Sequence, residues 1–350
     1  EETFARKISV AVGGHHGSWP GPYATEGIND SKCPLWDEMR RDLYWELRAV
    51  FPPPQIQAEF APYILNTLLA LLSGLTSVAD WVGSNADYFA LAGEVLGTRE
   101  YAAKSAISAK NALKKLGWIG WQPTGTVRDF SQVYAYLDFE KPHIIQQEII
   151  DAALDAPIAT LLLIEAPTGI GKTEIAQYLT DVWLQKHNGR GFYIAMPTQA
   201  TSNQMYGRTS QFLAHNYPDD LLNIPLAHGN ALFDPAQAAI QLNQVGDDEE
   251  TGVVAMSWFV QQSKQTLLAP FGVGTVDQTL LSVLQTRHFF VRMLGLSHKV
   301  VIFDEVHAYD TYMSTLFERL LRWLKAIGTS VIILSATLPS VTRQKLVRAY

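Results

Sequence analysis

Two patterns of apolar residues divide the chain. Residues 1 to about 115 carry apolar positions at helical spacing. An amphipathic stretch, Asp37–Phe51, is stopped by Pro52–Pro54 and followed by an apolar run, Phe60–Ala79, and by the Ala-rich Tyr101–Leu116. This part therefore predicts an all-helical domain.

From about Phe139 the pattern changes. Short apolar runs alternate with helical segments, and apolar runs of this length are typical of strands that are buried on both faces. The runs are Thr160–Ile164, Phe192–Met196, Val300–Phe303 and Val331–Leu334, and the helical segments are Thr173–Lys186, Gln199–Leu213 and Thr311–Ala326. Strands separated by helices predict a mainly parallel α/β sheet. We expect an all-α domain over 1–116, a Gly-, Pro- and Trp-containing linker over 117–138, and an α/β domain over 139–350.

Composition narrows the class of protein. The chain has 350 residues, of which 47% are hydrophobic and 17% charged, enough for a large core and for more than one domain. Its net charge of −7 argues against coating nucleic acid by bulk attraction, so such binding would need a local groove. The single cysteine, Cys33, excludes a disulfide framework within the chain and fits a reducing cytoplasm.

One stretch resembles a membrane span. Phe60–Ala79 has no charged residue over about the length that crosses a bilayer. It also contains Asn66, Ser73 and Ser77, polar side chains that are costly in lipid. We therefore expect a buried helix and no membrane partner.

A phosphate-binding loop follows the first predicted strand. The stretch IEAPTGIGKTE, Ile164–Glu174, lies between a strand and a helix, as such a loop requires. Thr168, Gly169 and Gly171 form the turn whose backbone N–H groups would surround phosphates. Lys172 would contact the β- and γ-phosphates of ATP and Thr173 would ligate Mg²⁺. Ala166 stands where the usual pattern has Gly, and a small residue still suits the turn.

A second strand ends in two carboxylates. Asp304 and Glu305 directly follow the run Val300–Phe303. Ligands of doubly wound sheets bind beyond the carboxyl ends of the strands, so these residues are expected beside the phosphate loop. Asp304 would hold Mg²⁺ and Glu305 would polarise the attacking water. Alone, the pair would be as typical of a helix N-terminus, where the dipole favours carboxylates.

The motifs APTGIGKT, MPTQATSNQM, DEVH and SATLP, in that order, resemble the first RecA-like domain of a superfamily-two helicase. The resemblance implies that Gln146, in the segment KPHIIQ, reads the adenine of ATP. It also implies roles for two further groups of residues. Those that would contact the backbone of a single strand are Thr198, Gln199, Thr275, Asp277 and Gln278, and those that would couple hydrolysis to movement are His307, Ser335 and Thr337.

The N-terminal half carries a second resemblance. Adjacent histidines in HHG, then ADWVGS, then a superfamily-two core resemble the CRISPR-associated helicase–nuclease of type I systems. In that family His15, His16 and Asp80 match metal ligands of an HD nuclease domain, and Ser84 matches a supporting hydroxyl. Imidazole and carboxylate together suit a divalent transition metal such as Mn, Ni, Co or Fe. Taken alone, a His-His pair is more typical of a surface or capping feature.

The resemblance implies an ATP- and Mg²⁺-dependent motor joined to a metal nuclease. It would act on the single DNA strand displaced by an RNA-guided multisubunit surveillance complex in a prokaryotic cytoplasm. The family pattern also has an earlier histidine, a His-Asp doublet and a second RecA-like domain, so we expect this sequence to be a fragment. Two alternatives stay open: an RNA or DNA helicase with a non-catalytic helical N-terminal domain, and a nucleotide-binding docking module without turnover.

Overall fold

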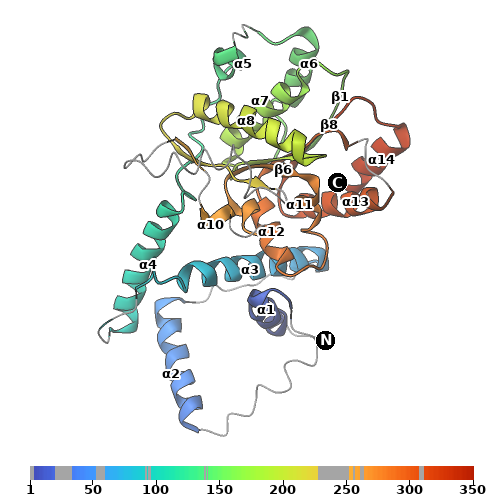
Figure 1. The fold of residues 1–350 in the computed structure, drawn as a ribbon. Coiled ribbons are helices and arrows are strands. Elements are labelled where there is room, and N and C mark those ends of the chain that lie inside the picture. Colours follow the sequence, from blue (N-terminus) through green and yellow to red (C-terminus); the bar gives the residue numbers. More distant parts are fainter. Residues whose placement is uncertain are drawn as a thin grey trace. The chain divides into compact units, whose positions relative to one another are not determined.

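The chain forms two compact units, Glu1–Lys115 and Leu116–Tyr350, in the computed structural model (Figure 1). The structure describes residues 4–19, 34–52, 60–90, 93, 96–137, 139, 141–227, 252–254, 257–260, 264–306 and 311–350. The expected fold class, an all-α domain followed by an α/β domain with a mainly parallel sheet, is confirmed. Each unit is considered by itself.

Every element described in the first unit is helical. These elements are α1 (Phe4–Gly13), the 3₁₀ turn η1 (Gly14–His16), α2 (Pro34–Val50), α3 (Pro62–Gly83) and α4 (Thr98–Lys115). Both α1 and η1 pack on α3, and α2 contacts α4. The helices predicted from periodicity are thus present, each displaced by a few residues at its ends.

Helix α3 has the length and apolarity of a membrane span, and within the described residues it is the one helix that does. Such a helix is weak evidence for a membrane, because core helices pass the same test. Two of its serines, Ser73 and Ser77, are fully buried. Their hydroxyls donate to the carbonyls of Ala11 (2.8 Å) and His15 (3.0 Å). One face of α3 is therefore held against α1 and η1 by hydrogen bonds from its serine hydroxyls to their backbone carbonyls.

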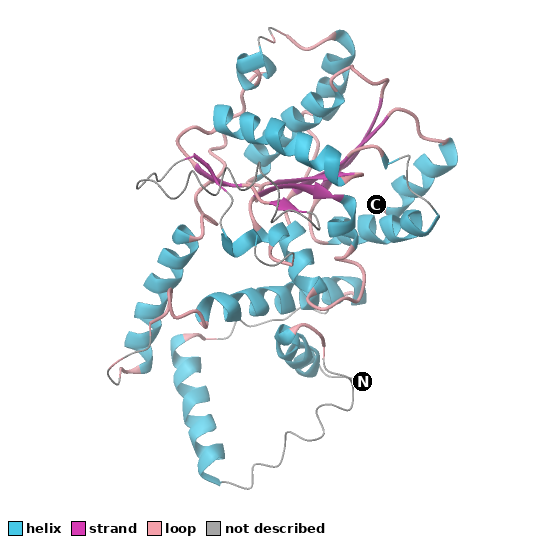
Figure 2. Ribbon diagram, in the orientation of Figure 1, coloured by secondary structure: helices cyan, strands magenta, loops and turns pink. Residues whose placement is uncertain are grey.

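The second unit is built on a six-stranded parallel sheet (Figure 2). In spatial order its strands are β1 (Leu161–Glu165), β8 (Ser330–Ser335), β7 (Val300–Phe303), β2 (Phe192–Met196), β6 (Phe271–Thr275) and β4 (Leu226–Ala227). A separate pair joins β3 (Leu221–Asn223) and β5 (Gly252–Val254). The four predicted strands are confirmed, whereas β6 was not expected.

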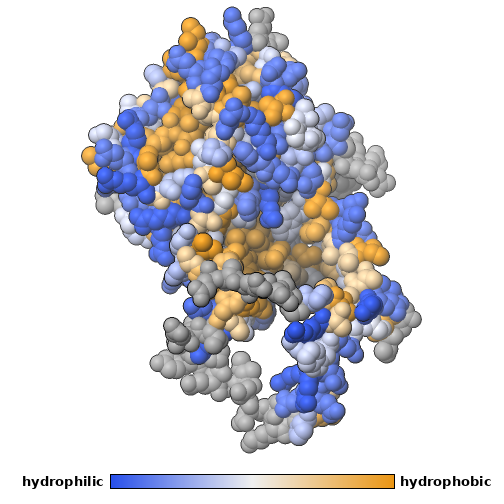
Figure 3. Space-filling model, turned by 180° about the vertical axis from the view of Figure 1, so that it is seen from behind, coloured by the Kyte–Doolittle hydropathy of each residue, from blue (hydrophilic) through white to orange (hydrophobic). Residues whose placement is uncertain are grey.

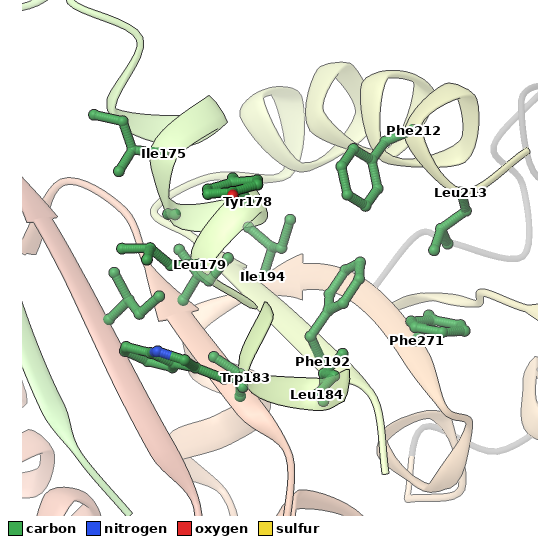
Figure 4. Packing of buried hydrophobic residues seen from close by; sticks show 14 of the residues in the cluster. Ile175, Tyr178, Leu179, Trp183, Leu184, Phe192, Ile194, Phe212, Leu213 and Phe271 are labelled. Atoms are coloured by element: carbon green, nitrogen blue, oxygen red, sulfur yellow. The ribbon is translucent and has the colours of Figure 1, made fainter. Parts of the chain in front are cut away.

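Helices cover both faces of this sheet (Figures 1 and 2). On one face lie α6 (Ile144–Ala153), α7 (Lys172–His187) and α8 (Gln199–Asn216), and on the other lie α11 (Val276–Leu280), α12 (Phe289–Leu296) and α13 (Thr311–Ala326). The remaining elements are α5 (Phe130–Val133), η2 (Ala135–Leu137), α10 (Ser257–Val260), η4 (Thr266–Leu268) and α14 (Ser340–Ala349). Residues Ile175 to Gln185 of α7 are all buried. Figure 4 shows Leu179 and Trp183 of this helix in one hydrophobic cluster with Ile194 of β2 and Phe212 of α8.

The surface of the second unit is mixed. On the face drawn in Figure 3, polar side chains in blue alternate with apolar ones in orange. Exposed apolar residues such as Ile144, Tyr312 and Val341 are scattered over different elements. Single exposed apolar residues are normal on folded proteins, so they do not by themselves mark an interface.

The described residues 117–137 of the expected linker, 117–138, supply side chains to this core. Trp121, Phe130 and Tyr134 are buried in the hydrophobic cluster with α7. The side-chain carbonyl of Gln185, on α7, accepts from the backbone N–H of Thr124 at 2.8 Å. The segment packs as part of the second unit, although the domain limits themselves stay a prediction.

A buried ionic cluster fixes the same segment. Asp181, on α7, is 2% exposed and pairs with Arg128 at 3.3 Å. Tyr217 donates its hydroxyl to the same carboxylate, and the Arg128 guanidinium also donates to the Asn216 carbonyl at 2.9 Å. Burial raises the pKa of Asp181, while Tyr217 and Arg128 act against that rise. Removing one partner would leave a buried polar group without its bond, so the cluster locks the segment to α7 and α8.

At the amino edge of the sheet, Lys299 is buried just before β7. Its ammonium group donates to the carbonyl of Leu267 at 2.8 Å and also to that of Ala269. Burial lowers the pKa of Lys299 to about 7, with a smaller effect from Arg190. The unfolded chain would keep the ordinary pKa of about 10.4, so it binds more protons than the folded chain between these values.

We expect the free energy of unfolding to rise with pH between about 7 and 10.4 because of Lys299. The slope from this group is at most roughly 1.4 kcal/mol per pH unit, one proton's worth. Urea unfolding at pH 7, 8, 9 and 10 should show this rise in the wild type and a smaller rise in Lys299→Met. Lys345→Met, at an exposed position of α14, is the matched control. Equal slopes in the wild type and Lys299→Met would contradict the prediction.

Candidate ATP site and metal centre

The carboxyl ends of five parallel strands meet at one edge of the sheet. Glu165 at the end of β1 is in register with Ser335 of β8, and Phe303 of β7 lies between Ile333 of β8 and Ala195 of β2. Next along, β2 and β6 end in register. The predicted phosphate loop, Asp304, the predicted nucleic-acid residues and the coupling residues Ser335 and Thr337 all follow or end these strands. The structure therefore brings them to the edge where such sheets bind ligands.

The phosphate loop has the backbone that its glycines allow. Gly169 and Gly171 have φ angles of 86° and 79°, in the region that side chains disfavour. A Cβ on Gly171 would lie 2.5 Å from the side-chain nitrogen of Gln146. Lys172 begins α7 and donates from Nζ to the carbonyls of Ala166 (2.6 Å) and Pro167 (2.9 Å). The loop, the helix start and the cation form one tight turn.

Gln146 ties this loop to α6. It is 5% exposed, accepts from the His143 backbone N–H at 2.8 Å and donates to the Ile170 carbonyl at 2.9 Å. The observed bonds position the loop, and adenine recognition by Gln146 stays a prediction. A buried amide with both ends bonded gives the loop a fixed distance from α6.

Asp304 lies half-buried after β7, and its backbone N–H bonds to the Ala195 carbonyl at 3.0 Å. Burial and the neighbouring Glu305 raise the pKa of Asp304, while Lys172 and Arg208 counteract part of that rise. Lys172 is thus within electrostatic reach of the carboxylate. The Thr173 hydroxyl and the Asp304 carboxylate are hard oxygen donors, the set that suits Mg²⁺ beside phosphates.

Glu305 and the predicted nucleic-acid residues differ in exposure. Glu305 is exposed and has a φ of 54°, unusual for a residue with a side chain. Thr198 caps the start of α8 and is exposed, as is Asp277 at the start of α11. Thr275 is only 6% exposed. The remaining members are Gln199, which is exposed, and Gln278, which is half-buried.

Two of the three predicted coupling residues lie at the end of β8 and in the turn before α14. Ser335 is buried, its hydroxyl donates to the Thr337 carbonyl at 3.0 Å, and its own carbonyl accepts from the Ala166 N–H at 3.2 Å. Thr337 is exposed. His307, the third predicted member, lies outside the described residues. The turn therefore contacts the first residue of the phosphate loop.

Sequence reasoning missed Glu165 at this edge. Its carboxylate accepts from the Leu338 backbone N–H at 2.8 Å and forms an ion pair with Arg343. The only signal in the sequence is an acidic residue at the end of an otherwise apolar strand, and nothing in the sequence names its partners.

The predicted metal ligands lie on η1 and at the end of α3. His15 and His16 have ring centroids 4.0 Å apart, and His15 Nδ1 bonds to the Val12 carbonyl at 2.8 Å. Ser77, one helical turn before Asp80, holds the His15 carbonyl at 3.0 Å. The predicted supporting residue Ser84 donates to the backbone carbonyl of Asp80 at 2.6 Å.

Packing of η1 on α3 brings the two parts of the predicted metal site toward each other. Within the described part of the chain, no three side chains of His, Cys, Asp or Glu form a cluster that could hold a metal ion. The imidazoles and the carboxylate still have the donor types that a divalent transition metal uses. A role of His15, His16 and Asp80 as metal ligands stays a prediction.

Comparison with known families matches both units. Residues 2–89 match the HD domain of Cas3, and residues 143–346 match the DEAD/DEAH box helicases. The chain belongs to the DEAD/DEAH box helicases, and its first residues match the HD domain of Cas3. The HD match falls within the first unit and the helicase match within the second.

Several relatives share the whole length of this chain. The CRISPR-associated endonuclease/helicase Cas3 of Thermus thermophilus is 38% identical over 100% of this chain and 38% of that protein. The CRISPR-associated nuclease/helicase Cas3 of Streptococcus thermophilus is 32% identical over 98% and 38%. A crystal structure of T. fusca Cas3-ATP superposes with a TM-score of 0.84 and 28% identity, over 99% of this chain and 38% of that one. The chain thus spans 38% of the length of these relatives.

Gly171→Ala tests the geometry of the phosphate loop. A side chain at this φ is strained by about 1–2 kcal/mol and would press on Gln146. We expect roughly tenfold weaker binding of ATP, measured by titration with a fluorescent nucleotide.

Gly207→Ala, on α8 with open space around its Cβ position, is the matched control and should leave binding unchanged. Wild-type affinity in Gly171→Ala would show that the loop does not hold phosphates in this conformation.

Proposed function

We propose that this chain provides the HD nuclease and first motor domain of an ATP-driven, DNA-degrading enzyme of CRISPR interference. The observation that carries this proposal is the meeting of the phosphate loop, Asp304 and the Ser-Ala-Thr turn at one edge of a parallel sheet. The family supports the same reading, since its named members are endonuclease/helicase proteins.

ATP hydrolysis would use the residues at that edge. Lys172 would exchange its bonds to the loop carbonyls for bonds to the β- and γ-phosphates. Thr173 and Asp304 would hold Mg²⁺, which would supply charge neutralisation at the phosphates. Glu305 orients and polarises a water molecule for attack on the γ-phosphorus, releasing ADP and phosphate. The catalytic set is thus Lys172, Asp304 and Glu305.

The nucleic-acid track would lie along the same edge. Exposed Thr198 and Asp277 lie at the starts of the helices that follow the neighbouring strands β2 and β6, where they can contact the backbone of a single strand. Gln199, Thr275 and Gln278 complete the set, and movement would run 3′ to 5′. The substrate is the DNA strand displaced by an RNA-guided multisubunit complex in a prokaryotic cytoplasm.

A surveillance complex as partner has support from one structure. A chain of a CRISPR RNA-guided surveillance complex, described as pre-nicking, matches this one with a TM-score of 0.66 and 25% identity, over 99% of this chain and 34% of that one. Pairing of the guide with its target displaces the other DNA strand. A motor with this fold would then take up that strand.

Cleavage would occur at the first unit. His15, His16 and Asp80 would hold divalent transition metal, which activates water and stabilises the leaving oxygen of a phosphodiester. Ser84 supports Asp80 through the helix carbonyl, and Ser77 sets the position of His15. The chemistry needs metal but not ATP, so the two units can be tested separately.

Lys172→Ala in the full-length protein should abolish ATP-dependent degradation of duplex DNA, because the phosphates lose their cation. Metal-dependent cutting of circular single-stranded DNA should remain, measured in Mn²⁺, Ni²⁺, Co²⁺ and Mg²⁺ without ATP. Lys186→Ala, at the far end of the same helix, is the matched control. Loss of single-strand cutting in a folded Lys172→Ala protein would refute the division into two independent modules.

Asp80→Ala should have the opposite effect. ATP hydrolysis stimulated by single-stranded DNA should persist, while cutting falls by several orders of magnitude because a metal ligand is lost. Asp87→Ala, an exposed carboxylate seven positions later, should cut normally. Retained cutting in Asp80→Ala would exclude this residue as a ligand. Nucleotide binding without turnover in the wild type would instead favour a docking module.

A further inference from the structure

We propose that Glu165 and Arg343 form a clamp that couples the phosphate loop to the Ser-Ala-Thr turn. Glu165 is the last residue of β1 and directly precedes the loop. One of its carboxylate oxygens accepts from the Leu338 N–H at 2.8 Å, and the other pairs with Arg343 of α14. The proposal rests on the proposed motor function and names positioning residues for it.

The ion pair and the hydrogen bond of this clamp contribute unequally to its stability. The side chains of Glu165 and Arg343 are 28% and 48% exposed, and exposed ion pairs contribute little because water screens them. Leu338 is only 5% exposed, so its backbone N–H depends on a protein acceptor. The hydrogen bond to Leu338 therefore carries the constraint, and Arg343 orients the carboxylate that accepts it.

The clamp adds to a backbone contact at the same place. The Ala166 N–H donates to the Ser335 carbonyl at 3.2 Å, one step beyond the paired residues of β1 and β8. The turn is thus held at its start by Ala166, and at its end by Glu165. The last residue of β1 and the first residue of the phosphate loop thus fix the two ends of the turn.

One of these two residues, Ala166, also contacts the lysine of the phosphate loop. Lys172 donates to the carbonyl of Ala166, whose own N–H holds the turn. When phosphate oxygens attract Lys172 instead, the Ala166 peptide loses one partner while Glu165 keeps its hold on Leu338. Nucleotide occupancy then changes the strain on the turn through residues 165 and 166. Such coupling needs an element that can exchange one set of partners for another. In this proposal the element is Lys172, whose partners are the loop carbonyls without nucleotide and the phosphates with it.

The test uses the full-length protein with Glu165→Ala, Glu165→Gln and Arg343→Gln. The readout is the ratio of ATP hydrolysis with single-stranded DNA to hydrolysis without it, together with DNA unwound per ATP. Glu165→Ala should lower the ratio roughly 2- to 30-fold. Glu165→Gln should have a smaller effect, because its side-chain carbonyl can still accept from Leu338. Arg348→Gln, on the same helix, should leave the ratio unchanged.

Two measurements separate coupling from a purely structural role. Hydrogen exchange should show a faster Leu338 amide in Glu165→Ala and wild-type exchange in Arg348→Gln. Glu165→Ala/Arg343→Gln should have a ratio no lower than Glu165→Ala, because both substitutions remove the same clamp.

Three outcomes would overturn the proposal. A wild-type ratio despite a faster Leu338 amide would mean that the clamp is only structural. Unchanged Leu338 exchange in Glu165→Ala would mean that the clamp does not exist in solution. Absence of DNA-stimulated hydrolysis in the wild type would defeat the motor function itself, and this failure is recognised because it precedes any substitution.

Discussion

The parallel register of β1, β8 and β7 is the constraint on which the second unit depends. Parallel strands in register end at one edge, and no single strand could place a cation, a carboxylate and a serine turn side by side. The crossover helices must then return behind the sheet, which explains why α7 is buried over most of its length. The order of the strands in the sheet, not their order in the sequence, therefore determines which residues meet at the site.

The sequence predicted what local patterns control. Apolar runs gave β1, β2, β7 and β8 nearly to the residue, and the Gly-Lys-Thr turn was recognisable because its backbone demands glycine at 169 and 171. It did not predict β6, whose two glycines are typical of turns. Those glycines suit β6 because a Cβ at Gly274 would lie 2.1 Å from the carbonyl of Ala227 on β4.

Partners far apart in the chain could not be predicted. The Gly- and Pro-containing segment before α5 has the composition of a linker. Trp121 nevertheless anchors it in the core, and the buried Asp181 forms an ion pair with Arg128. Burial of a loop depends on which distant residues its aromatic and ionic side chains contact. The spacing of apolar residues along the chain carries no information about these contacts.

The pairing of β1 also bears on synthesis. Among the strands of the sheet β1 pairs with β8 alone, and their partners Leu161 and Val331 are far apart in sequence. A ribosome has therefore made the phosphate loop long before it makes the strand that supports it. Until Ser335 has left the ribosome, both edges of β1 lack a partner strand, which invites chaperones or wrong partners. The nascent chain consequently cannot assemble its nucleotide site early, and an interrupted product would carry the ATP motif without the fold that uses it.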